Sequence, residues 1–152
     1  MLRRSLFGVI TAAAIAFSTG AVAADFGTAE EAKALLGKAV TAVKADEKKA
    51  FDMFNKGDGG FKDRDLYVFC ANASDDTINA GPASVIGKKL TDLKDKTGKA
   101  FGVEMKKVAA ESSLAEVRYM WPRPGADTTP VQKVSFVTKV ADQICGVGYY
   151  KP

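Results

Sequence analysis

Four residues in the last third of the chain carry aromatic, cationic and hydroxyl groups at spacings that favour one surface. Tyr119 and Trp121 alternate in an apolar run, and Lys133 and Ser135 alternate in the next one. Residues two apart share a face of a β-strand. An aromatic wall with one cation and one hydroxyl is typical of a pocket for a small organic anion, because the wall excludes water and the charge fixes a carboxylate. The alternative is core aromatics beside a surface lysine, which the residues alone favour.

The sequence contains no histidine, which excludes several kinds of catalytic and metal site. Ser-His-Asp and Cys-His catalysis, histidine-ligated zinc and covalent haem attachment all require that side chain. The carboxylates Asp63, Asp65, Asp75 and Asp76 stand beside turn residues, where solvated or capping roles are usual. We therefore expect no enzyme, no metal and no cofactor.

Lysines and glycines near the middle and the end of the chain have ordinary structural interpretations. The lysines between Lys88 and Lys99 are interleaved with Asp92 and Asp95, which indicates a solvated loop and not a nucleic-acid site. Gly146 and Gly148 lie too close to the C-terminus for a helix to follow, so they indicate close backbone approach within a strand.

The two cysteines, Cys70 and Cys145, have two possible states. In an exported protein they could form a disulfide, and free cysteines could equally be buried as small apolar residues. A bridge would close a loop of about 75 residues, which the entropic model values at about 4 kcal/mol.

The first 24 residues have the layout of a secretory signal peptide. Arg3 and Arg4 precede an apolar run from Leu6 to Phe17, and small residues follow up to Ala24. The run is shorter than the roughly 20 residues that span a membrane. We expect cleavage after Ala23 or Ala24, no stable membrane insertion, and residues 25–152 as a single periplasmic or secreted domain.

The remaining chain predicts an α+β domain with a mainly antiparallel sheet. Thr28 and Glu31 have capping-box spacing, and apolar residues recur every three or four positions up to Phe54, which predicts one long helix. A lysine-rich stretch, 83–98, predicts a loop with a helical turn, and 99–110 a second helix. The expected strands cover 65–73, a short piece around Ile78, 117–121, 131–140 and 143–150.

The order of short motifs resembles the Cache family, in particular its single-Cache type of extracytoplasmic sensor domain. The resemblance covers nearly all of the chain after residue 24. Its motifs are Gly60 to Phe69, Ile86-Gly87-Lys88, Leu93-Lys94-Asp95, Gly98 to Phe101, Tyr119 to Pro122, and Gly146 to Tyr150.

The resemblance implies a PAS-like, five-stranded antiparallel sheet packed against the long N-terminal helix. A ligand would lie between one sheet face and the segment that bridges the second and third strands. Tyr119, Trp121 and Lys133 would bind it, with Phe69 and Met105 as apolar lining. The first and last strands would be neighbours, which would bring the two cysteines within reach of each other.

The resemblance further implies a soluble extracytoplasmic sensor for a small organic acid. No membrane helix or signalling domain is expected after Tyr150, so a membrane kinase or chemoreceptor would report the binding. The alternative is an interaction or structural module of a periplasmic complex with no ligand. The chain departs from the family pattern at Asp75-Asp76, where Asp-Gly is usual, at Asn79, where histidine is frequent, and at Phe136, where a tyrosine would add a hydroxyl near the pocket.

Overall fold

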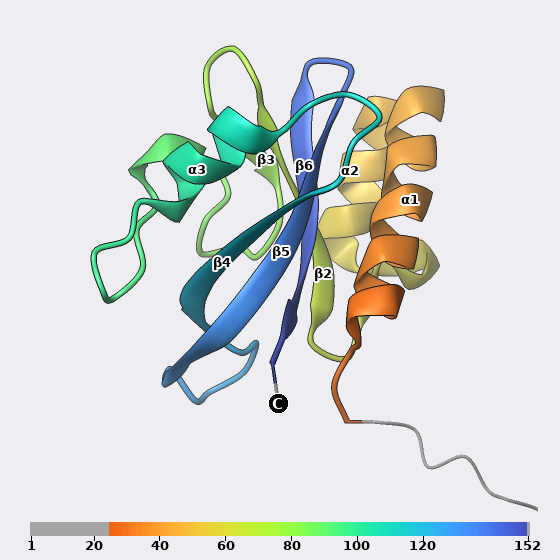
Figure 1. The fold of residues 1–152 in the computed structure, drawn as a ribbon. Helices are drawn as coiled ribbons and strands as arrows, with labels where there is room; N and C mark the ends of the chain where they lie inside the picture. The colour runs from red at the N-terminus through yellow and green to blue at the C-terminus, as the bar shows by residue number, and fades with distance from the viewer. Residues whose placement is uncertain (1–24, 152) are drawn as a thin grey trace, which may run out of the picture.

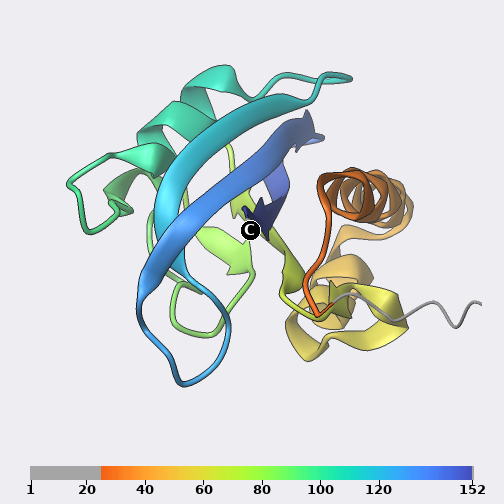
Figure 2. The same cartoon turned by 60° about the horizontal axis from the view of Figure 1, so that its bottom comes forward.

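A central sheet separates two helical layers in the computed structural model, which describes residues 25–151. Helices α1 (Ala29–Ala45) and α2 (Glu47–Lys56) cover one face of the sheet. Helix α3 (Phe101–Val108) and the segment before it cover the other face (Figures 1 and 2). The signal peptide that we expect at residues 1–24 lies outside the described residues.

The long helix expected up to Phe54 is present but interrupted at Asp46. The predicted capping box is formed, since the amides of Thr28 and Glu31 each bond to the other residue's side chain. Asp46 has an extended backbone, and its carboxylate accepts from the amide of Lys49 as the N-cap of α2. A side chain that caps well favours a new helix start over continuation, which accounts for the break.

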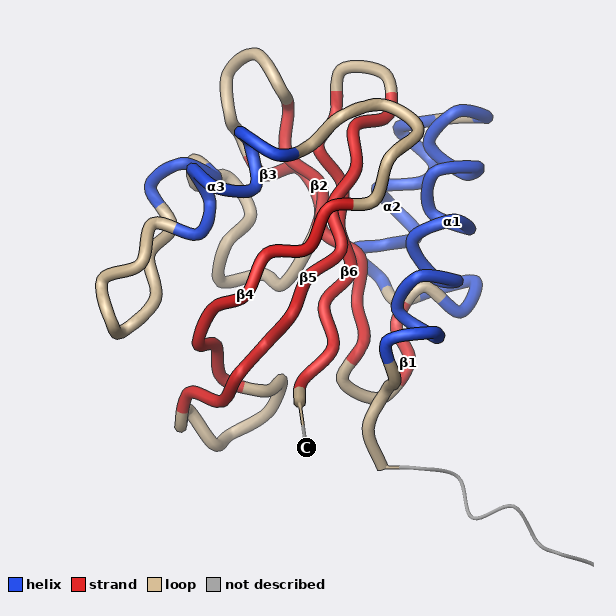
Figure 3. The backbone as a smooth tube through the Cα atoms, in the orientation of Figure 1, coloured by secondary structure: helices blue, strands red, loops and turns tan. Residues whose placement is uncertain are grey.

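All strand pairs are antiparallel, in the order β1-β2-β6-β5-β4, with β3 also pairing with β2 (Figure 3). The bounds are β1 Lys62–Asp63, β2 Leu66–Asn72, β3 Ile78–Ala80, β4 Ala115–Pro122, β5 Pro130–Val140 and β6 Gln143–Tyr150. The predicted α+β class is confirmed. The five expected strands are all present, and the two-residue β1 is a sixth that the sequence did not indicate.

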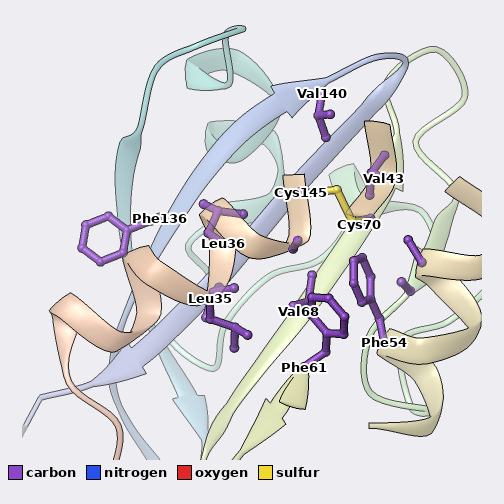
Figure 4. Close-up of a cluster of buried hydrophobic side chains, with 14 of the residues drawn as sticks. Leu35, Leu36, Val43, Phe54, Phe61, Val68, Cys70, Phe136, Val140 and Cys145 are labelled. Atoms are coloured by element: carbon purple, nitrogen blue, oxygen red, sulfur yellow. A yellow bond between two sulfur atoms is a disulfide. The ribbon is translucent and has the colours of Figure 1, made fainter. Parts of the chain in front are cut away.

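The core between the sheet and the helices α1 and α2 contains the disulfide (Figure 4). Cys70 of β2 and Cys145 of β6 face each other in register, with Cα atoms 4.1 Å apart, and their sulfur atoms are bonded. Leu36, Phe54 and Val68 pack around them. The bridge decides between the two states that the sequence left open, and it ties together the two central strands of the sheet.

Removing the bridge should lower the free energy of unfolding. The double substitution Cys70→Ala and Cys145→Ala restores the entropy of an unfolded loop of about 75 residues, so we expect a loss of about 4 kcal/mol. Urea unfolding followed by circular dichroism measures it. A reductant should weaken the wild-type protein by a similar amount and leave the variant unchanged. Equal stabilities of the two proteins would show that the bridge does not constrain the unfolded chain.

Candidate functional site

The sheet face that points away from α1 carries the polar and aromatic residues singled out above. Lys133 of β5 lies opposite Tyr119 of β4 on one side and Tyr150 of β6 on the other. Ser135 lies one position along on the same face, opposite Gly148. The alternation read from the sequence therefore places the cation, the phenol and the hydroxyl side by side, as the pleat of a strand requires.

A small cavity lies between this face and its covering segment. Its volume is about 30 Å³, which is room for one or two water molecules. Four of the six predicted ligand-binding residues line it: Phe69, Met105, Tyr119 and Trp121. Lys133 and Ser135 do not line it, although they share its sheet face.

Three aromatic rings that line the cavity pack against one another. The ring of Tyr119 lies parallel to that of Phe101 of α3, with centroids 4.0 Å apart. Trp121 meets Phe101 and Tyr119 edge-on, with centroids 5.3 Å and 6.2 Å away. A ligand larger than a few atoms can therefore enter only if this aromatic group, or the segment that covers it, moves.

Lys133 is completely buried, and its ammonium is surrounded by tyrosines. Its Nζ donates to the hydroxyl of Tyr67, 2.6 Å away, and lies 4.1 Å from the Tyr67 ring centroid and 4.8 Å from that of Tyr150. No carboxylate among residues 25–151 forms an ion pair with it. Burial lowers the pKa of the Lys133 ammonium to about 7, with Asp65 opposing the shift.

The three tyrosines of this face remain protonated near neutral pH. Burial raises the pKa of Tyr67, Tyr119 and Tyr150 above the ordinary value of a phenol. The hydroxyls of Tyr119 and Ser135 share a hydrogen bond of 2.9 Å, and that of Tyr150 donates to the carbonyl of Pro122. The face thus offers hydroxyl groups and one ammonium, and Asp65 supplies a negative charge that acts on that ammonium without forming an ion pair with it.

Two glycines of β6 leave the space that these side chains occupy. A Cβ on Gly148 would lie 2.4 Å from both Cε of Lys133 and Oγ of Ser135. A Cβ on Gly146 would lie 2.4 Å from Cζ of Phe69. The interpretation of these glycines as points of close approach is confirmed.

One buried carboxylate anchors the covering segment to the sheet. Asp95 accepts hydrogen bonds from the hydroxyl and amide of Thr97, from the amide of Lys99 and from the amide of Met120 in β4. Burial alone would raise the pKa of Asp95, but these bonds lower it to about 2. The segment in front of α3 is therefore fixed to the strand that carries Tyr119 and Trp121.

Some residues of the face were not identified from the sequence, and one was misplaced. Tyr67 is two residues from Phe69 in the same strand, so its place on this face could have been predicted from the sequence. The place of Tyr150 beside Lys133 depends on the register of β6 against β5, which the sequence does not reveal. Phe136 belongs to the opposite core, where it stacks on Tyr149 near α1. The expectation that Phe136 removes a hydroxyl from the pocket is therefore wrong.

Neither a cluster of metal ligands nor a membrane-spanning helix occurs among the described residues. Among residues 25–151, no three histidine, cysteine or acidic side chains gather as metal ligands would. No helix in that range is both long and apolar enough to cross a bilayer.

Gly148→Ala should destabilise the fold by displacing Lys133 and Ser135. The added methyl group overpacks a buried site, for which we expect a loss of about 1–3 kcal/mol in chemical unfolding. Gly37→Ala is the matched control, because a Cβ at this exposed helical position meets nothing within 4 Å. It should stabilise the protein by up to about 1 kcal/mol. Equal effects of the two substitutions would contradict the close approach at Gly148.

Lys133→Met should change how stability depends on pH. The unfolded chain keeps the lysine protonated up to its ordinary pKa, whereas the folded chain releases the proton above about pH 7. Between these values the unfolded state binds more protons, so wild-type stability rises with pH by up to about 1.4 kcal/mol per unit relative to the variant. Below pH 7 the cost of burying the charge is complete and the difference is constant. Urea unfolding at pH 6, 7, 8 and 9 measures this; parallel profiles from pH 7 to 9 would refute it.

Comparison with known proteins supports a shared architecture. A family model described as Cache domain (dCache_2) matches residues 30–150. The fold is similar to that of a methyl-accepting chemotaxis protein from Vibrio parahaemolyticus, with a TM-score of 0.62 and 21% identity over 80% of this chain and 86% of that one. The fold is also similar to that of a periplasmic sensor domain of a chemotaxis protein, with a TM-score of 0.57 and 23% identity over 81% of this chain and 90% of that one.

A third solved structure is a Cache chemosensory domain studied for carboxylic acid recognition, with a TM-score of 0.58 and 23% identity over 81% of this chain and 88% of that one. At these identities the likeness to solved structures is one of fold. No curated protein matches the chain in sequence. Because the family model spans most of the described residues, the chain belongs to the Cache domain family.

Proposed function

We propose that this Cache domain binds a small organic acid outside the cytoplasm and passes its occupancy to a signalling partner. The observation that carries the proposal is the ammonium of Lys133, which is completely buried without a paired carboxylate beside an aromatic cavity. A buried charge is costly unless it is paired, and Lys133 has no ion pair among residues 25–151, so the site favours a bound anion.

The contacts of Lys133 suggest how a carboxylate would be held. Tyr67 lines the cavity, and its hydroxyl accepts the hydrogen bond of the ammonium. A ligand carboxylate that entered beside Tyr67 would accept a charge-assisted bond from Lys133, and the Tyr67 hydroxyl would be free to donate to it. Tyr119 and Trp121 would cover the apolar part of the acid, with Phe69 and Met105 as lining and Ser135 holding the Tyr119 hydroxyl.

Binding of this kind requires the cavity to enlarge. A volume of about 30 Å³ holds less than a two-carbon acid, so the stack of Phe101 on Tyr119 would have to open. The resulting movement of α3 and its preceding segment would be the structural signal.

Location and partners are supported by separate observations. The disulfide between Cys70 and Cys145 suits an oxidising compartment, and the N-terminal residues have the layout of a signal peptide. The similar solved structures include sensor domains of chemotaxis proteins. We infer a periplasmic or secreted domain that serves a membrane kinase or chemoreceptor.

A second candidate is an interaction or structural module that binds no ligand. The observation in its favour is the tight aromatic packing, which leaves so little room at the site. In that case the buried lysine and tyrosines would be part of the core, with their polar groups hydrogen-bonded to one another, and a protein partner would bind another surface.

Short carboxylic acids should raise the melting temperature if the acid-binding proposal holds. At a concentration ten times its dissociation constant, a ligand stabilises the folded state by about 1.4 kcal/mol, or a few degrees for a domain of this size. A panel of acetate, propionate, lactate, pyruvate, malonate and succinate at matched ionic strength, followed by thermal shift, tests this.

Lys133→Met and Trp121→Ala should abolish the shift, whereas Lys48→Met, at an exposed position of α2, should preserve it. Stabilisation that is unchanged in both site variants would place the acid elsewhere. No shift in the wild-type protein, together with a partner that co-purifies stably, would favour the interaction module.

A further inference from the structure

A groove of about 480 Å³ adjoins the cavity. It is bounded by α2, by β1 and the start of β2, by the loop after β3, and by the connection between β4 and β5. Tyr67, Pro82 and Trp121 line both the groove and the cavity, so these three residues form the wall between them. The groove also contains a cation that sequence analysis did not single out, Arg123.

Aromatic rings hold the guanidinium of Arg123 in place. Its Cζ lies 4.3 Å from the ring centroid of Phe26 and 5.1 Å from that of Tyr150. The Tyr150 ring is itself fixed, since its hydroxyl donates to the carbonyl of Pro122. A guanidinium that stacks on aromatic rings has already lost much of its conformational freedom, so less entropy is lost when it binds a ligand.

Arg123 forms an ion pair but no hydrogen bond within the described part of the chain. Its Nε lies 3.7 Å from Oδ2 of Asp65, and neither of these buried atoms has a hydrogen-bond partner. The other oxygen of Asp65 accepts from the amide of Gly27. None of the Arg123 nitrogens forms a hydrogen bond within residues 25–151, and 27% of the side chain is exposed.

Two cations and one carboxylate line the groove, and Asp65, the ion-pair partner of Arg123, is not part of the lining. Lys62 is a second, exposed cation of the lining, and Asp127 is its carboxylate. One oxygen of Asp127 accepts from the amide of Thr129, and this bond lowers the pKa of Asp127, so that residue stays ionised near neutral pH. The planar fork of an arginine matches a carboxylate in a bidentate pair, which a lysine cannot reproduce.

We propose that this groove is a second carboxylate-binding site, in which Arg123 makes the bidentate contact and Lys62 adds charge. The site is separate from the cavity and does not depend on what the cavity binds. Tyr150 stands between the two cations, with Lys133 Nζ 4.8 Å and Arg123 Cζ 5.1 Å from its ring centroid. The rest of the ligand that bears this carboxylate would lie in the groove, on the far side of Tyr67, Pro82 and Trp121 from the cavity.

Acetate is the probe, and the Nε–Hε signal of Arg123 in ¹⁵N-labelled protein is the readout. Sodium acetate replaces sodium chloride at constant ionic strength and pH 6.5. We expect a saturable shift of this signal and of the amides of residues 125–128. The same shift should occur in Lys133→Met, which separates this site from the proposed function of the cavity.

Matched variants report on each charge of the groove through the same amides. Arg123→Gln should weaken acetate binding roughly tenfold or more, because it removes a charge-assisted bidentate pair. Arg123→Lys should restore it only in part, Lys62→Gln should weaken it less than Arg123→Gln, and Asp127→Asn should strengthen it. Lys48→Gln, outside the groove, should have no effect.

Four results would overturn the proposal. They are an Arg123 signal that acetate does not move, a shift that chloride reproduces, binding that survives Arg123→Gln, and tighter binding of phosphate than of acetate. The last would show a general oxyanion site, since a guanidinium can pair in bidentate fashion with phosphate as well as with carboxylate. A fifth result would also overturn it, because a shift that disappears in Lys133→Met would show that acetate acts from the cavity instead.

Discussion

The buried ammonium of Lys133 is the constraint on which this side of the domain depends. A lysine in the middle of a sheet face loses its hydration, and only the Tyr67 hydroxyl and two aromatic rings replace it. Gly148 of β6 must lack a side chain, because a Cβ there would collide with the aliphatic chain of Lys133 on the neighbouring strand β5. The arrangement costs stability, which is typical of residues retained for function.

The opposite side of the sheet supplies the stability that this arrangement lacks. There the face is apolar, the helices α1 and α2 cover it, and the disulfide joins β2 to β6. One face of the sheet thus contributes stability and the other carries the candidate site, because alternate residues of each strand point to opposite sides. Buried polar groups among the apolar residues of this face can persist when the other face holds the strands in register.

Alternation along single strands made much of the site predictable, whereas contacts between strands were not. Tyr119 and Trp121 could be placed on one face because side chains two residues apart in a strand point to the same side of the sheet. Tyr119 lies opposite Lys133 and Trp121 opposite Val131, and this register was not predicted; a shared pocket was one interpretation of the residues, which the family resemblance favoured. Tyr150 joins the face only through the register of β6, and sequence patterns do not fix the register between distant strands.

The other differences between the expected and the observed fold each have a physical cause of their own. The helix break follows from the capping by Asp46, which competes locally with an apolar pattern that continues through it. Phe136 was assigned to the wrong face because a family pattern gives a position in the chain but not the direction of a side chain. The small volume of the cavity depends on how Phe101 packs on Tyr119, which no local pattern reveals.

The anchoring of Asp95 to β4 has a consequence for self-association. β4 is the last strand of the sheet, so its outer backbone groups could pair with a strand from another molecule. Asp95 occupies the amide of Met120, and the ammonium of Lys99 occupies the carbonyl of Arg118. The segment that closes the cavity therefore also blocks this edge, so an opening large enough to release it would expose the chain to strand addition and aggregation.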